Sequence, residues 1–124
     1  MDYSRLVAHL FDSPPSLGPL AGANCQGDAG EGGRRVVIQA AVQAGQLDAV
    51  AFRALGCPHL IAASALAAEA LRGQPVAALR DYDPLTLSDR LGMPAGKRGR
   101  LLILQDALQN CFRDWDTTQP AGHR

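Results

Sequence analysis

Cys57 stands where the sequence could most readily support chemistry. It belongs to the stretch LGCPHLIAASALAAEALRG (55–73), in which a strand-like segment ends, Gly56 allows a turn and Pro58 starts a helix. Unpaired amides and the positive end of the helix dipole stabilise a thiolate at such a junction and lower its pKa. The pattern predicts an activated thiol that can bind a metal or act as a nucleophile. A small buried cysteine at a tight turn would give the same pattern.

Cys25 and Asp28 form a second pair with metal-binding chemistry. A thiol and a carboxylate three residues apart, on backbone flanked by glycine, can converge on one ion. The proline and glycine in residues 12–33 predict a loop there, or a loop interrupted by a short edge strand near 20–23. The pair alone is a weak signal, because a turn aspartate beside an unrelated cysteine would look the same.

The segments around these residues predict the elements that must position them. Apolar and polar residues alternate over 34–43 and again over 47–55, with a turn between, which predicts a β-hairpin that ends close to Cys57. Helical spacing predicts helices over 3–11, 59–72 and 98–115, and shorter ones within 75–82 and 83–91. Cys111 falls on the apolar stripe of the last long helix and is predicted to be a core residue.

Composition narrows the class of protein. The 124 residues predict a single domain, over residues 1–115, with a disordered tail over 116–124. Twelve basic and twelve acidic residues balance, which argues against binding to nucleic acid or an anionic membrane. Three cysteines without regular spacing indicate reduced thiols, and no segment reaches the roughly 18 apolar residues of a membrane span. We therefore expect a cytoplasmic protein.

Several short motifs in register give the chain a family resemblance. Their order and spacing over residues 3–115 resemble the IscU/NifU-type iron-sulfur cluster scaffold family. The matching residues are Tyr3, Ser4, Val7, Pro14 and Gly18, then Phe52, Arg53, the block GCPHLIAAS, Glu69 and Gly73, then the loop MPAGK ending at Lys97, and finally Asp106, Ala107, Asp114 and Trp115.

The resemblance implies an α+β fold, with a small antiparallel sheet of about three strands packed against four to five helices. It also implies a site that holds iron or a [2Fe-2S] cluster through three cysteines and an aspartate, with a histidine nearby. Thiolates suit such clusters as soft ligands, and a carboxylate keeps the site labile. Carried over by position, the first cysteine is Cys25, the aspartate is Asp28 and the second cysteine is Cys57.

The chain also departs from the family pattern. The aspartate follows the first cysteine after three residues, whereas the family interval is two, and Gly99 and Arg100 stand where the family has its histidine and its third cysteine. Cys111 is eleven residues further along a helix, about 16 Å away, so His59 is the more plausible substitute ligand. Arg100 is expected to face Asp28 and the two thiolates, supplying the positive charge that a metal supplies elsewhere.

Three functions follow from the resemblance and its departures. The first is a cluster scaffold or carrier that uses Cys25, Asp28 and Cys57, completed by His59 or by a second molecule. The second is a zinc-binding relative or a sulfur acceptor, in which Cys57 takes persulfide sulfur from a cysteine desulfurase. The third is an adaptor that kept the fold but lost the metal. None of these is a conventional enzyme, since the sequence has no CxxC, phosphate loop or dinucleotide fingerprint.

The implied partners are a cysteine desulfurase and, through the loop that ends at Lys97, an Hsp70-type chaperone. Ala95 and Gly96 replace the residues that usually occupy this loop, which weakens the second implication. For the assembly state we expect a monomer or a weak homodimer.

Overall fold

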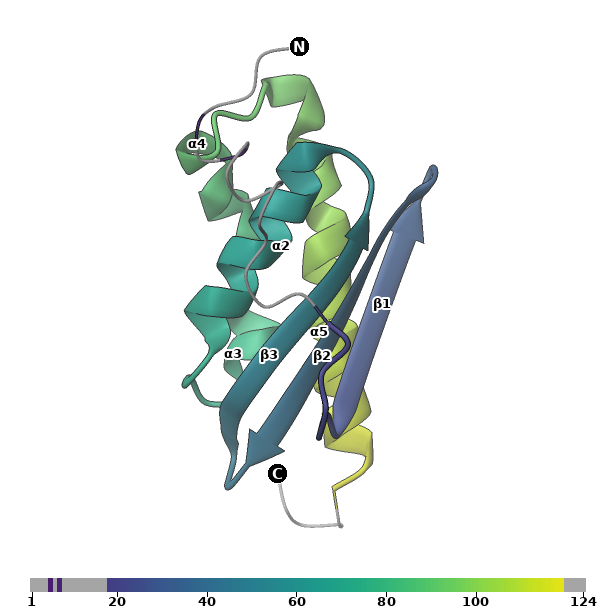
Figure 1. Ribbon diagram of the computed structural model, residues 1–124, viewed down its shortest axis with the longest axis vertical. Helices are drawn as coiled ribbons and strands as arrows, with labels where there is room; N and C mark the ends of the chain where they lie inside the picture. Colours follow the sequence, from purple (N-terminus) through teal and green to yellow (C-terminus); the bar gives the residue numbers. More distant parts are fainter. Residues whose placement is uncertain (1–4, 6, 8–17, 120–124) are drawn as a thin grey trace.

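The protein folds as an antiparallel sheet with helices on one face (Figure 1). The structure is a computed structural model that describes residues 5, 7 and 18–119. The three strands lie in the order β1-β2-β3, and the α+β fold expected from the resemblance is confirmed. The strands are β1 (Cys25–Glu31), β2 (Arg34–Gln43) and β3 (Gln46–Leu55), and the helices are α2 (Pro58–Leu71), α3 (Ala78–Asp81), η1 (Pro84–Thr86), α4 (Leu87–Arg90), η2 (Ala95–Arg100) and α5 (Leu101–Thr117).

The predicted hairpin of β2 and β3 is confirmed. Alternate residues of β2 are buried on the helical side of the sheet, namely Val36, Ile38, Ala40 and Val42. Ala44 and Gly45 form the two-residue turn, and both have positive φ angles (52° and 75°), as a turn that matches the strand twist requires. The alternation was a sound predictor because one face of the sheet packs on the helices and takes the alternate apolar side chains of β2.

β1 was not predicted. Cys25 and Asp28 were expected in a loop, but they belong to an edge strand that pairs along its length with β2, and residues 20–23 form no strand. Glycine at positions 27 and 30 weakens the intrinsic strand signal. The strand forms because β2 pairs with it on one side and α5 covers its inner face, and neither contact is local in sequence.

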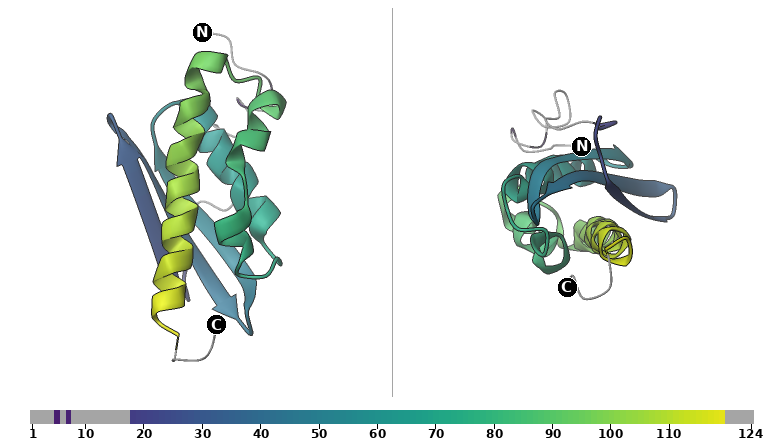
Figure 2. Two further views of the ribbon diagram at one scale, coloured as in Figure 1. Left: turned by 180° about the vertical axis from the view of Figure 1, so that it is seen from behind. Right: turned by 90° about the horizontal axis from the view of Figure 1, so that it is seen from below.

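The helical layer consists mainly of α2 and α5, which run along the sheet (Figure 2). α2 packs against β3 and is buried on most of its sides, which its alanines permit. α5 lies along β1 and contacts β2, with Leu101, Leu104, Leu108 and Cys111 turned into the core. The predictions of both long helices and of the short helices between them are therefore confirmed.

Several boundaries differ from the predicted ones. The last long helix is preceded by a separate 3₁₀ helix, η2, and α5 continues to Thr117, past the predicted start of the tail. Most of the predicted helix over 3–11 and the end of the tail, 120–124, lie outside the described residues. Within the part of the chain that the structure describes, no helix is long and apolar enough to cross a membrane.

Candidate functional site

Cys57 lies at the predicted junction between β3 and α2. β3 ends at Leu55, Pro58 is the first residue of α2, and Cys57 is its N-cap residue with extended backbone angles. Gly56 turns the chain with a φ of 146°, and a side chain there would press against Arg34 and Leu60, at 3.2 and 3.3 Å. The sequence therefore places a half-buried thiol at the start of a 14-residue helix.

The surroundings of Cys57 favour its thiolate. Burial raises the pKa of the Cys57 thiol, but the amide of Leu60, the guanidinium of Arg100 and the amide of His59 together outweigh that effect. The pKa of Cys57 is therefore below its ordinary value, in agreement with the sequence prediction of an activated thiol. An arginine beside the sulfur adds to the effect of the helix N-terminus.

His59 and Lys97 complete the neighbourhood of Cys57. His59 is only 3% exposed, and its pKa is lowered first by burial and then by the positive charges of Lys97 and Arg100. Its imidazole is therefore neutral at pH 7. Lys97 and Arg100 both belong to η2, and every charged residue in the last turn of η2 is basic. The site is a cysteine and a neutral histidine next to cationic side chains.

Cys25 does not join this site. In the strand ladder Cys25 is level with Ala40 and Val50, whereas Gly30 is level with Leu55 at the end of β3. Val50 and Leu55 are five positions apart on β3, so Cys25 lies about 16 Å, along the strands, from the end of the sheet that carries Cys57. The expectation that the two thiols share one pocket is wrong, because β1 is an extended strand and not a loop that could fold back.

Asp28 does not join it either. Its side chain is exposed, and it forms an ion pair with Arg35 of β2. In the alternation of β1, Asp28 is on the opposite side from Cys25 and Gly27, which face the helices. Arg100 therefore lies beside Cys57 as expected, whereas Asp28 pairs with Arg35 and the other two thiols contact each other, so the expected contacts of Arg100 with them are not formed among the described residues.

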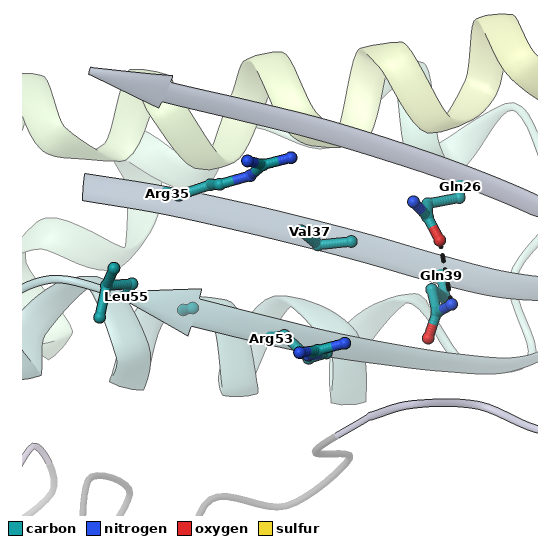
Figure 3. Close-up of a pocket in the computed structure, with 7 residues that line it drawn as sticks. Gln26, Arg35, Val37, Gln39, Arg53 and Leu55 are labelled. Carbon is teal, nitrogen blue, oxygen red and sulfur yellow. Dashed lines mark hydrogen bonds between the residues drawn. The ribbon is translucent and has the colours of Figure 1, made fainter. Parts of the chain in front are cut away.

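The outer face of the sheet has a hollow of its own, of about 460 Å³ (Figure 3). Arg35, the partner of Asp28, lines this hollow together with Gln26, Gln39 and Arg53, and the two glutamines share a 3.0 Å hydrogen bond. These side chains come from the three strands and point away from the helical layer. Asp28 and its partner therefore belong to a different surface from Cys57.

Cys25 instead contacts Cys111, for which the sequence predicts a place in the core but no contact with Cys25. Their sulfur atoms are 3.6 Å apart, and both side chains are buried between β1 and α5. The two residues are 86 positions apart, so no spacing rule could have paired them. Gly27 was the available signal, since glycine inside a strand often marks a close approach by another backbone.

The donor set at Cys57 does not fit a cluster held by three cysteines and an aspartate. The residues beside its sulfur offer one thiolate and positive charge, and the described residues contain no group of three or more histidine, cysteine or acidic side chains able to hold a metal ion. Iron-sulfur clusters bind thiolates, and a guanidinium is not a ligand. The predicted ligand set of Cys25, Asp28 and Cys57 is not assembled by this fold.

Comparisons with known proteins agree with the fold. The profile of the NifU-like N terminal domain matches residues 2–121. The bifunctional protein NifU/MnmA of Rubrobacter xylanophilus is 28% identical over 120 residues, which are 93% of this chain and 24% of that protein. The chain therefore spans about a quarter of the length of this relative.

Two solved structures have the same fold at low identity. A NifU-like N-terminal protein from Brucella abortus superposes with a TM-score of 0.71 at 17% identity, covering 94% of this chain and 95% of the other. A candidate iron-sulfur cluster assembly scaffold protein for the SUF system from Fervidobacterium islandicum AW-1 gives a TM-score of 0.70 at 12% identity, covering 89% and 96%. Because the family profile spans nearly the whole sequence, the chain belongs to the NifU-like N-terminal domain family.

Proposed function

We propose that this protein acts in iron-sulfur cluster assembly as a sulfur acceptor, with Cys57 as the residue that carries the sulfur. The observation behind the proposal is the setting of Cys57, a thiol with a lowered pKa beside Arg100, without a second thiolate in contact. The role in cluster assembly is supported by family membership and by the description of a structural relative as a candidate scaffold.

Sulfur transfer needs only one activated thiol. The Cys57 thiolate would attack the outer sulfur of a persulfide on a cysteine desulfurase, forming a sulfur-sulfur bond to Cys57 while the desulfurase thiolate leaves. Electrons balance without an added oxidant or reductant, because the transferred sulfur keeps its oxidation state. The lowered pKa supplies the attacking thiolate, and Arg100 would then stabilise the negative charge of the new persulfide.

The alternative functions place different demands on the site. A cluster carrier would need ligands from a second molecule, since Cys25 and Asp28 lie elsewhere, and a zinc site would need donors beyond Cys57 and His59. An adaptor would need no thiol at all. The sulfur acceptor is the function that uses the activated Cys57 thiol and needs no further ligand.

Incubation with a cysteine desulfurase and free cysteine tests the proposal. We expect intact-mass spectrometry to show the gain of one sulfur atom by the wild-type chain, mapped to Cys57 and removed by a reductant. Cys57→Ser should gain none, and Cys25→Ala, the matched control, should gain as much as the wild type.

Anaerobic addition of iron and sulfide, followed by desalting, separates the alternatives. A cluster absorbance that survives desalting and is lost in Cys57→Ser, with no sulfur transferred to Cys57, would replace the proposal with the cluster carrier. Unmodified Cys57 together with equal desulfurase binding by wild type and Cys57→Ser would replace it with the adaptor.

A further inference from the structure

A pair of thiols lies at the other end of the sheet, away from Cys57. Cys25 begins β1 and Cys111 belongs to the third turn of α5, and both sulfur atoms are turned into the space between these elements. Neither residue takes part in the function proposed above. Cys25 and Cys111 therefore form a cluster of nucleophilic side chains that is separate from the Cys57 site.

The backbones of β1 and α5 approach closely at this point. Gly27, two residues after Cys25 on the same side of the strand, has no room for a side chain, because a methyl group there would overlap the Cys111 amide nitrogen and the Ala107 carbonyl oxygen. Such a close approach brings the two cysteines to a sulfur-sulfur distance of 3.6 Å. A disulfide bond of about 2.0 Å then needs a movement of only about 1.6 Å.

α5 is also held against the edge of β1 by polar contacts. The Asp114 carboxylate accepts a 2.8 Å hydrogen bond from the Gln26 amide, and the Asn110 side chain donates one of 2.8 Å to the Asp28 carbonyl. These two residues are four positions apart on α5 and flank Cys111. The helix is therefore fixed in the orientation that keeps Cys111 over Cys25.

The two sulfur atoms differ in access and in acidity. Cys25 is 4% exposed and lines a hollow of about 270 Å³ with Asn24, Gln26 and Asp114, whereas Cys111 is fully buried. The thiol of Cys111 donates to Cys25, so the pKa of Cys25 is lowered, and the pKa of Cys111 is raised by that shared hydrogen bond and by burial. Cys25 is the sulfur that a small reagent can reach.

We propose that Cys25 and Cys111 are a dithiol that hydrogen peroxide oxidises to an intramolecular disulfide, with Cys25 attacking first and Cys111 resolving. The Cys25 thiolate displaces hydroxide from the peroxide and becomes a sulfenic acid. The Cys111 thiol then attacks that sulfur, the sulfur-oxygen bond breaks, and water leaves with the Cys111 proton. Two thiols are oxidised, and one peroxide is reduced to two waters.

The disulfide would join residues 86 positions apart and fasten α5 to the edge strand. A cross-link over so long a loop restricts the unfolded chain strongly, so the oxidised form should unfold at a temperature several degrees above that of the reduced form. The inference does not depend on the function of Cys57, which lies at the opposite end of the sheet.

The test uses the full chain carrying Cys57→Ser, in which only the pair remains. After reduction and exposure to hydrogen peroxide, we expect the intact mass to fall by two hydrogen atoms. Peptide mapping should show Cys25 linked to Cys111, with reversal by dithiothreitol. If the pair stays reduced in the folded protein, or links only in urea, the proposal is wrong.

The order of reaction is tested separately in two matched variants that also carry Cys57→Ser. With Cys111→Ala, Cys25 should form a sulfenic acid that dimedone traps. With Cys25→Ala, Cys111 should react at least roughly ten times more slowly, because its sulfur is fully buried, whereas Cys25 lines a hollow that a small reagent can enter. Equal trapping of the two residues would contradict the order, and circular dichroism of both variants checks that they remain folded.

Discussion

Where β3 leads into α2, Cys57 is half-buried beside Arg100, whereas where β1 begins, Cys25 is buried and its nearest polar partner is Cys111. The two environments favour a thiolate by different means. At Cys57 the negative charge of the thiolate is stabilised by the Arg100 guanidinium and by the N-terminus of α2. At Cys25 it is stabilised by a hydrogen bond from the Cys111 thiol. The first arrangement suits exchange with another molecule, and the second suits reaction within the chain.

The close contact of β1 and α5 should give the largest mutational effect. Gly27→Ala places a methyl group on the backbone of α5, 2.6 Å from the Asn110 carbonyl carbon, and backbone on both sides cannot yield easily. We expect the free energy of unfolding to fall by about 3 kcal/mol. Urea denaturation followed by circular dichroism measures it.

Gly99→Ala is the matched control at the other end of the sheet, because a methyl group there meets nothing within 4 Å. Its free energy of unfolding should change by no more than about 1 kcal/mol. Equal stability of the two variants would mean that α5 does not lie directly on β1, so that Cys25 and Cys111 would be too far apart to form a disulfide.

The role of Arg100 predicts a smaller effect, on reactivity. Arg100→Leu removes a positive charge that lowers the pKa of Cys57, so the pKa rises and less thiolate is present at pH 7. Alkylation of Cys57 by iodoacetamide should slow roughly tenfold at pH 7, and the difference should vanish at a pH above both pKa values, where both forms are thiolate. Peptide mass spectrometry follows Cys57 separately from the buried cysteines.

Arg98→Leu is the control for charge alone. Arg98 is two residues away on η2 and pairs with Asp89 at 3.4 Å, and it does not contribute to the lowered pKa of Cys57. Its rate should follow the wild-type pH profile. A shift of the same size in both variants would show that net charge, and not the contact of Arg100 with the thiol, activates Cys57.

The parts of the fold that were predictable have a local cause. The alternation in β2 and the Gly-Cys-Pro sequence before α2 each reflect packing or capping within a few residues, so the hairpin, the helix and the activated thiol could be read from the sequence. β1 could not be read, since its glycines make a poor strand until α5 covers it. Likewise, the position of Arg100 beside Cys57 followed from family register and not from any local pattern.

The candidate site was predicted less well than the fold for the same reason. The prediction that Cys25 and Asp28 lie beside Cys57 assumed that residues 25–28 form a flexible loop. In such a loop the thiol and the carboxylate could both turn toward one ion. In an extended strand, adjacent side chains alternate between faces and distance accumulates by about 3.3 Å per residue. Both effects act here, so Asp28 is on the other face of β1 from Cys25, and Cys25 is at the far end of the sheet from Cys57.

The separation of Asp28 from Cys57 gives the smallest expected effect. Asp28→Asn removes an exposed ion pair with Arg35, whose side chain is 62% exposed, so water and salt already screen most of the attraction. The free energy of unfolding should change by less than about 1 kcal/mol. Sulfur loading of Cys57 by a desulfurase should be unchanged, since the carboxylate points away from the helical side of the sheet.

Asp114→Asn is the variant to compare with Asp28→Asn. The Asp114 carboxylate accepts a hydrogen bond from the Gln26 amide of the edge strand β1. We expect Asp114→Asn to lower the free energy of unfolding by about 1 kcal/mol, more than Asp28→Asn, while also leaving sulfur loading intact. Loss of loading in Asp28→Asn alone would place its carboxylate near Cys57 in solution. That outcome would require β1 to leave the edge of the sheet. The two ends of the sheet would then no longer differ as proposed, with Cys57 exchanging sulfur at one end and Cys25 and Cys111 enclosed at the other.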